Sequence, residues 1–140
     1  MAKFIEMNKH KKFLIHLSYI LLILGCEESD LIHPIKNTKW LTVKIEKPDT
    51  TIATPEYFLE FNAEGFITNT DANTCEGRFQ ISDTDGIEFS DEFCTNKGGD
   101  SPLSLEVRDY ILNAGHFELN RDSLRLRASE VDLILVRTRE

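Results

Sequence analysis

The sequence has little of several features that define whole classes of proteins. Its 140 residues include only one Trp and four Pro, which excludes a low-complexity or proline-rich protein. Positive charge is scarce, since 16 Lys and Arg stand against 24 Asp and Glu and give a net charge of −8. This balance argues against a nucleic acid, or an anionic membrane, held by charge. The length and the 41% apolar content fit one ordinary globular domain.

A long hydrophobic run is also missing. The longest one, residues 13–24, has about a dozen residues, whereas a helix that spans the hydrocarbon core needs roughly 20. Lys9, Lys11 and Lys12 precede this run. A basic start followed by a short apolar run is typical of a secretory signal, so residues 1–25 are predicted to be a lipoprotein signal peptide.

The end of the apolar run points to lipidation. Ile23, Leu24 and Gly25 lead into Cys26 and resemble a bacterial lipobox, in which the Cys thiol accepts a diacylglyceryl group. Two or three acyl chains hold a protein in a bilayer, where one would be marginal. We expect Cys26 to be the lipid anchor of an outer membrane lipoprotein, periplasmic or exposed at the cell surface. The alternative is a secreted protein with a spare Cys26.

The mature chain is more acidic than its precursor. Removing residues 1–25 leaves 12 Lys and Arg against 23 Asp and Glu, a net charge of −11. Residues 26–36 are predicted to form an acidic tether and residues 37–140 the folded domain. The acidic residues 27–30 resemble a surface-export signal of some bacterial lipoproteins; the simpler interpretation is a solvated linker.

The folded part is predicted to be mainly β. Alternating apolar residues favour strands, and Gly65 is expected to take a positive φ in the turn of a hairpin. The pattern predicts a small antiparallel β-barrel or rolled sheet of about eight strands with one covering α-helix. The expected strands are residues 40–45, 57–61, 66–69, 77–81, 87–89, 117–119, 124–126 and 131–136.

One helix is predicted, over residues 101–114. Ser101 supplies a capping hydroxyl, and Pro102 suits the first helical position. Apolar residues recur on one face, and Gly115 is placed to end the helix. The residues on that face are Leu103, Val107, Tyr110, Ile111 and Ala114.

Two cysteines remain once Cys26 is assigned to lipid. Outside the cytoplasm disulfides persist, and an even pair allows one connectivity, Cys75 with Cys94. Two free buried thiols are the alternative. Asp91 and Glu92 precede Cys94 and would raise its pKa, which argues against a nucleophilic role.

The order of features in residues 40–137 resembles the META domain, the HslJ-type heat-shock lipoprotein family. Trp40 opens the first strand, and the segment from Asn73 through Gly77 to Phe79 is similar to the family's Asn-x-x-x-Gly-x-aromatic pattern. In many members a Cys directly precedes this Asn, whereas here that residue is Ala72. The resemblance implies a small all-β envelope domain without known catalysis or cofactor, in some cases linked to stress tolerance.

Recognisable catalytic motifs are missing. The sequence has no Gly-x-Ser-x-Gly, phosphate loop or zinc-protease helix, and neither His33 nor His116 has a second ligand at metal-binding spacing. We therefore predict no enzyme activity, no cofactor and no metal. Arg121, Arg125 and Arg127 form a candidate partner-binding face for an acidic surface component, unless they are paired in salt bridges.

The sequence therefore predicts a non-enzymatic envelope domain. It would act through contacts with an unknown envelope protein or surface component, with no nucleic acid involved. The alternative is a lipocalin-like binder of a small apolar ligand inside the barrel. A filled interior favours the first, and an open apolar cavity favours the second.

Overall fold

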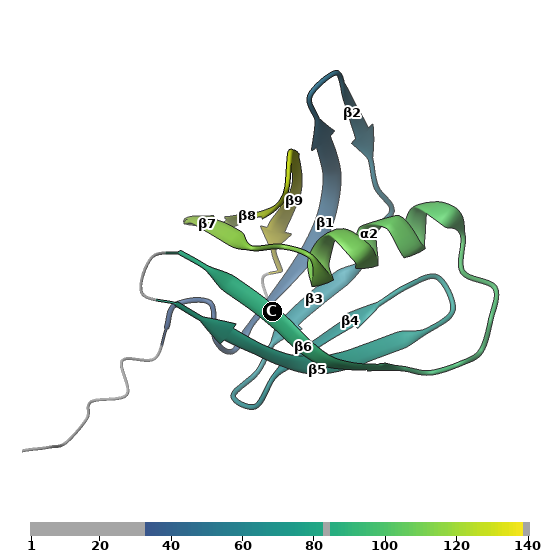
Figure 1. Cartoon of the computed structure of the whole chain (residues 1–140), viewed down its shortest axis with the longest axis horizontal. Coiled ribbons are helices and arrows are strands. Elements are labelled where there is room, and N and C mark those ends of the chain that lie inside the picture. Colours follow the sequence, from purple (N-terminus) through teal and green to yellow (C-terminus); the bar gives the residue numbers. More distant parts are fainter. Residues whose placement is uncertain (1–32, 83–84, 139–140) are drawn as a thin grey trace, which may run out of the picture. The chain divides into compact units, whose positions relative to one another are not determined.

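A computed structural model describes residues 33–82 and 85–138 and shows a mainly β domain (Figure 1). Nine strands and one helix make up the part of the chain that is described. In chain order they are β1 (Thr38–Lys47), β2 (Thr50–Ala53), β3 (Phe58–Phe61), β4 (Phe66–Asn69), β5 (Thr74–Ile81), β6 (Ile87–Cys94), α2 (Pro102–Leu112), β7 (His116–Asn120), β8 (Ser123–Ala128) and β9 (Val131–Arg137).

The strands form a single antiparallel sheet that curls into a half-barrel. Eight of them follow the order β6-β5-β4-β3-β1-β9-β8-β7, and β2 pairs with β1 off this path. The last strand, β9, lies between β1 and β8, which fits its largely apolar sequence. The fold class expected from the sequence, a rolled antiparallel sheet with one covering helix, is confirmed.

The two outer strands of the half-barrel, β6 and β7, meet at one end. Gly86 and His116 form an isolated antiparallel bridge. The N–H of Ile87 donates to the carbonyl of Gly115 at 3.2 Å, and that of Phe117 donates to Asp85 at 2.9 Å. These bonds satisfy backbone groups that an open sheet would leave unpaired at this end.

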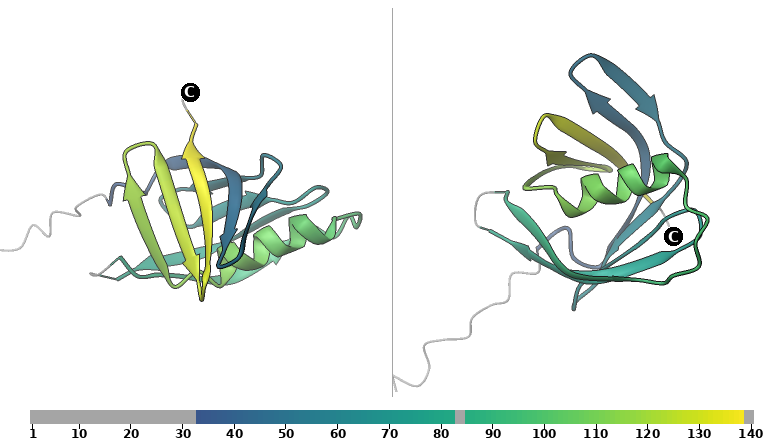
Figure 2. Two further views of the ribbon diagram at one scale, coloured as in Figure 1. Left: turned by 90° about the horizontal axis from the view of Figure 1, so that it is seen from above. Right: turned by 45° about the vertical axis from the view of Figure 1, so that its right-hand side comes forward.

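Helix α2 lies across the concave side of the sheet (Figures 1 and 2) and contacts β6, β8 and β9. Its N-terminus is capped as the sequence predicted, because the hydroxyl of Ser101 accepts a hydrogen bond from the N–H of Ser104. Val107 and Ile111 are buried in the core, whereas Leu105 is 37% exposed. The helix ends slightly earlier than expected, at Leu112, with Asn113 as its C-terminal cap.

Side chains from the sheet and the helix fill the interior. Trp40, Phe61 and Leu135 from the sheet have no solvent exposure, and Ile111 from the helix has 1%. All four belong to one hydrophobic cluster. The alternation that predicted the strands is the cause, since every second residue of a strand points to the same face. The helix therefore closes a packed core.

The β1–β2 hairpin was not predicted. Residues 47–50 were expected to end the strand, but the chain turns there and β2 pairs with the second half of β1, from Thr50 opposite Lys47 to Ala53 opposite Lys44. Three of the four residues of β2 are exposed. A strand with little burial has no apolar alternation to reveal it.

Two glycines mark places where strands approach closely. Gly65 does not have the positive φ that we expected; a Cβ there would lie 2.0 Å from the carbonyl oxygen of Gly77. A Cβ on Gly77 would lie 2.7 Å from both the Phe66 ring and the carbonyl oxygen of Ser90. Crowding by neighbouring backbone, rather than turn conformation, therefore selects glycine at Gly65.

The packed domain begins before the expected end of the tether. Ile35 has no solvent exposure and belongs to the hydrophobic cluster. The hydroxyl of Thr38 donates a short hydrogen bond to the carbonyl of Ile35, and the indole N–H of Trp40 donates to the Thr38 hydroxyl at 2.7 Å. The segment before β1 is thus part of the fold from about Ile35 onward.

Candidate functional site

The predicted lipid anchor, Cys26, lies outside the described residues, as do the signal peptide and the acidic residues 27–30. Lipidation and export therefore remain predictions from the sequence. Among the described residues, no helix is long and apolar enough to cross a membrane.

Cys75 and Cys94 form a disulfide, the pairing expected from the sequence. They lie directly opposite each other on β5 and β6, and Cys75 is fully buried. Just beyond them, the N–H of Thr95 donates to the carbonyl of Thr74 at 3.0 Å. The bridge therefore fixes the end of β6 at the start of the loop that leads to α2.

A bulge in β6 determines how the residues before Cys94 are aimed. Ser90 pairs with Arg78, and Phe93 pairs with Glu76, so Asp91 and Glu92 together oppose Gly77. Asp91 takes a φ of 53°. An extra residue of this kind bends a strand and re-aims the side chains beside it. Phe93 is left 69% exposed as a result.

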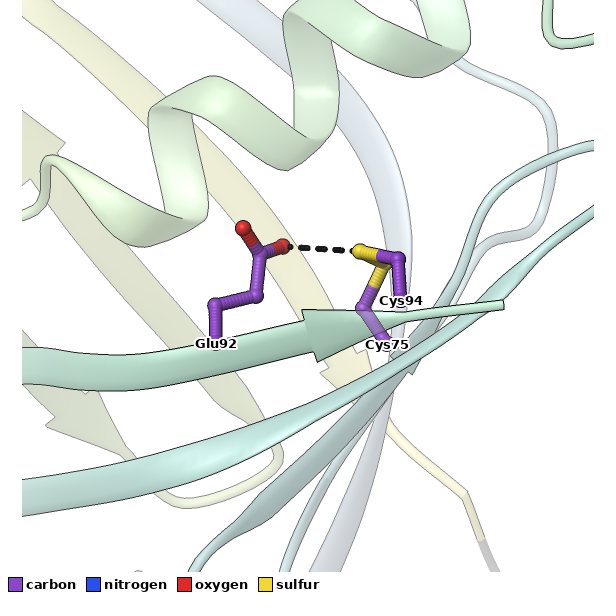
Figure 3. A group of neighbouring side chains, drawn as sticks. All are labelled: Cys75, Glu92 and Cys94. Carbon is purple, nitrogen blue, oxygen red and sulfur yellow. Dashed lines mark hydrogen bonds between the residues drawn. A yellow bond between two sulfur atoms is a disulfide. The ribbon is translucent and has the colours of Figure 1, made fainter. Parts of the chain in front are cut away.

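Glu92 lies against the disulfide and on the same side of the sheet (Figure 3). One of its carboxylate oxygens, Oε1, is 3.3 Å from the sulfur of Cys94 and 3.7 Å from Nε of Arg108 on α2. The side chains of Glu92 and Arg108 are only 22% and 29% exposed. Burial raises the pKa of the Glu92 carboxyl, the Arg108 guanidinium opposes this change, and Asp109 adds to it.

An open hollow of about 470 Å³ lies beside the disulfide. Its walls come from the strand ends, the loop before α2 and the helix itself. The lining residues used below are Cys75, Cys94, Leu105 and Arg108. The hollow gives solvent and small solutes a path toward the sulfur atoms.

A hydrogen-bonded network centred on Asn73 holds the loop of residues 95–101 in place. The Asn73 side-chain amide donates to Asp100 at 2.6 Å, and its carbonyl oxygen accepts from the Thr95 hydroxyl at 3.0 Å and from the Lys97 N–H at 2.8 Å. The Thr70 hydroxyl and the Ala72 N–H keep the pKa of Asp100 below its usual value, with Asn73 adding to the effect. Both ends of the Asn73 side-chain amide are thus used to hold this loop against the turn before β5.

Asp71 connects the same turn to the start of the helix. Its carboxylate accepts from the Tyr57 hydroxyl at 2.7 Å and from the Ser101 N–H at 2.9 Å. Hydrogen bonds from Ser101 and then Tyr57 lower the pKa of Asp71. The sequence analysis did not identify this connection, because the partners are about 14 and 30 residues away in the chain.

Acidic side chains form ion pairs with two of the three arginines of the candidate partner-binding face, Arg125 and Arg127. Asp132 accepts hydrogen bonds from Arg125 at 2.8 Å and from Arg127 at 2.8 Å. The further ion-pair partners of Arg125 are Glu46 and Glu118, both at 3.9 Å. Arg125 and Arg127 are thus engaged in the salt-bridged surface that was the alternative expectation. Arg121 lies in the turn between β7 and β8, with a φ of 52°.

Comparison with known proteins informs the fold alone. No protein-family model matches the chain, and no curated protein matches it. Two solved structures are similar. An NMR structure of a protein from Burkholderia xenovorans is 12% identical over 82% of this chain and 98% of that one, with a TM-score of 0.64.

The second similar structure is a crystal structure of a DUF4847 family protein from Bacteroides vulgatus. It is 13% identical over 76% of this chain and 96% of that one, with a TM-score of 0.60. Both alignments cover nearly the whole of the other protein, so the domain is similar as a unit. At these identities, the likeness extends to the architecture and carries no activity with it.

Proposed function

We propose that this chain is a lipid-anchored domain of the cell envelope, related to the META and HslJ-type proteins, that acts through contacts of its surface and performs no catalysis. The anchor would be Cys26, acylated after removal of residues 1–25. The site of action would be the outer membrane, on its periplasmic or its outer side. The domain would act during stress, so the experiments below include cells grown under stress.

The filled interior is the observation that supports surface contacts over binding of a ligand inside the sheet; the anchor rests on the sequence around Cys26. A lipocalin-like binder needs an apolar cavity inside the barrel. Here Trp40, Phe61 and Leu135 occupy that space with no solvent exposure, and Val107 and Ile111 of α2 pack onto them. Contacts with a partner would therefore use the outer surface.

The polar clusters also support a binding role over an enzymatic one. The carboxylates of Asp71 and Asp100 accept hydrogen bonds from the loop and turn that they join, and Asp132 is paired with two arginines. Each of these carboxylates is engaged by hydrogen bonds or ion pairs within the fold. A catalytic acid or base must instead be free to exchange a proton with a substrate.

The anchor can be tested in cells that express the full chain. The wild type should incorporate a labelled fatty acid and fractionate with membranes, and its processing should be blocked by an inhibitor of the lipoprotein signal peptidase. Cys26→Ser should lose the label, whereas the matched change Ser29→Ala should keep it. Equal labelling of the wild type and Cys26→Ser would contradict the proposal.

The contact role can be tested by crosslinking on intact cells, followed by purification of the anchored chain. One envelope protein or surface polymer should be recovered with the wild type and lost when exposed surface residues are changed. Recovery of a small apolar molecule bound in stoichiometric amount to the purified domain would instead support the lipocalin-like alternative.

A further inference from the structure

The geometry points to a metal site that the disulfide masks: when the bridge is reduced, Cys75, Cys94 and Glu92 form a site for a thiophilic divalent cation such as Zn²⁺. One ligand atom from each of these residues already lies within 4.8 Å of the other two. Zinc is bound by thiolate sulfur at about 2.3 Å and by carboxylate oxygen at about 2.0–2.2 Å, usually in a tetrahedron. Three protein ligands of this kind leave the fourth position for water.

The two cysteines are held where both sulfurs can reach one ion. Cys75 and Cys94 are direct cross-strand partners. On one side of this pair Glu76 lies opposite Phe93, and on the other the N–H of Thr95 donates to the carbonyl of Thr74. Two thiolates on one tetrahedral ion lie about 3.8 Å apart, from the bond length above. Rotation of the side chains covers that separation, so the strands need not move apart.

The third ligand is already in position. The bulge opposite Gly77 turns Glu92 onto the face that carries the disulfide (Figure 3), with Oε1 at 3.3 Å from the Cys94 sulfur. A disulfide sulfur has no proton to offer a carboxylate, and the ion pair with Arg108 at 3.7 Å holds Glu92 on this side of the sheet. With the bridge reduced, the same carboxylate would lie beside two thiols, and carboxylate joins thiolate as an ordinary zinc ligand.

Arg108 provides the matching charge. Its Nε is buried and has no hydrogen-bond partner among the described residues, although it lies 3.7 Å from Glu92. A buried donor without a partner calls for a specific explanation. A divalent cation with two thiolates and one carboxylate carries a net charge of −1. The Arg108 guanidinium, which also pairs with Asp109 at 3.1 Å, would offset part of that charge, and second-shell partners of this kind orient metal ligands.

The chemistry balances with a dithiol as the reductant. The dithiol gives two electrons and two protons to the Cys75–Cys94 bond, which becomes two thiols, while the dithiol itself becomes a disulfide. Binding of the cation then displaces the two thiol protons into solvent. The hollow beside Cys94 gives the reductant and the ion access.

The test uses the full chain, with Cys26→Ser in every sample so that Cys75 and Cys94 supply the only thiols. The protein is reduced with a dithiol without oxygen, freed of the reductant, and titrated with Co²⁺. We expect one Co²⁺ per reduced chain, with thiolate-to-cobalt charge-transfer absorption that Zn²⁺ abolishes. The oxidised chain should show no such absorption. Absence of the absorption from the reduced chain would overturn the proposal.

A pair of variants tests the carboxylate ligand. Glu92→Gln should weaken Zn²⁺ binding by at least about tenfold. Loss of a residue that only orients a metal ligand already lowers metal affinity by about that factor, and Glu92 would be a ligand itself. Glu88→Gln, an exposed change on the same strand, should leave the affinity unchanged. Equal Zn²⁺ affinities in the two variants would overturn the proposal. An unfolded chain that bound the ion through its two thiols alone would give the same result. As a second measurement, Zn²⁺ should protect both thiols from alkylation in the reduced wild type and in Glu88→Gln, and protect them less in Glu92→Gln.

Discussion

The side-chain amide of Asn73 donates to the carboxylate of Asp100 at 2.6 Å, across 27 residues of sequence. Together with the bonds that Asn73 accepts from Thr95 and Lys97, this contact joins the β4–β5 turn to the loop before α2. Asn73 is itself only 8% exposed. Its polar groups are therefore largely withdrawn from water and depend on these partners.

Asn73→Ala should lower the free energy of unfolding by about 1–3 kcal/mol, because it removes one hydrogen-bond donor to the Asp100 carboxylate and the acceptor for Thr95 and Lys97. Urea denaturation followed by circular dichroism measures the loss. Asn96→Ala, an exposed change in the same loop, is the control and should change the stability by less than about 0.5 kcal/mol. Similar losses in both variants would mean that the network does not stabilise the domain.

Gly77→Ala should destabilise the domain by about 1–3 kcal/mol, the usual cost of overpacking. The added Cβ would lie 2.7 Å from the Phe66 ring and from the carbonyl oxygen of Ser90. Gly115→Ala is a matched control, since a Cβ there meets nothing within 4 Å. Thermal unfolding of the two variants should separate them clearly; a Gly77→Ala protein as stable as the control would refute the close approach.

Ile111→Ala should cost about 2–5 kcal/mol, because it removes buried methyl groups and leaves a cavity between helix and sheet. Leu105 of the same helix is 37% exposed, so Leu105→Ala should lower the free energy of unfolding by less than about 1 kcal/mol. Equilibrium denaturation in urea gives both values. If the Ile111 variant lost no more than the Leu105 variant, α2 could not be the element that closes the core.

Acid should remove the stabilisation that Asp132 provides. Hydrogen bonding from Arg127, aided by the charge of Arg125, holds the pKa of Asp132 below its usual value although burial acts in the opposite direction. A depressed folded-state pKa stabilises the fold above the unfolded value of about 3.9. This stability is lost as the pH falls through the folded-state pKa.

Asp132→Asn should therefore cost about 1 kcal/mol near neutral pH, and the difference from the wild type should shrink as the pH falls from about 5 to about 2. Unfolding free energies at a series of pH values measure this change. Asp49→Asn, an exposed change at the tip of the β1–β2 hairpin, is the control near neutral pH and should change the unfolding free energy by less than about 0.5 kcal/mol. A difference that stayed constant with pH would argue against the ion pair as its source.

The strands that bury one face could be predicted from the sequence, because burial imposes a two-residue period. A strand over residues 57–61, as predicted, puts Tyr57, Leu59 and Phe61 on one face, and all three are buried. Strand β2 escaped prediction because it pairs with β1 at an exposed edge and three of its four residues are exposed. Ile35 was missed for a related reason: a single buried residue in a polar segment has no period.

The disulfide and the helix were predicted because each depends on a local or countable feature. Ser101 and Pro102 identify a helix start, and two remaining cysteines allow one pairing. The surroundings of the disulfide could not be predicted in this way. Whether Glu92 reaches Cys94 depends on the bulge opposite Gly77 and on Arg108 of a helix that follows later in the chain. Such contacts arise from tertiary packing.

The arrangement of β1 and β9 brings the two ends of the folded domain together. The N–H of Thr138 donates to the carbonyl of Lys39 at 3.0 Å, so the chain leaves β9 beside the residues at which it enters β1. The tip of the β1–β2 hairpin lies at the other end of β1, about 30 Å away by the rise of an extended strand. An antibody or crosslinker directed to that tip would therefore bind at the opposite end of β1 from the residues where the chain enters β1 and leaves β9.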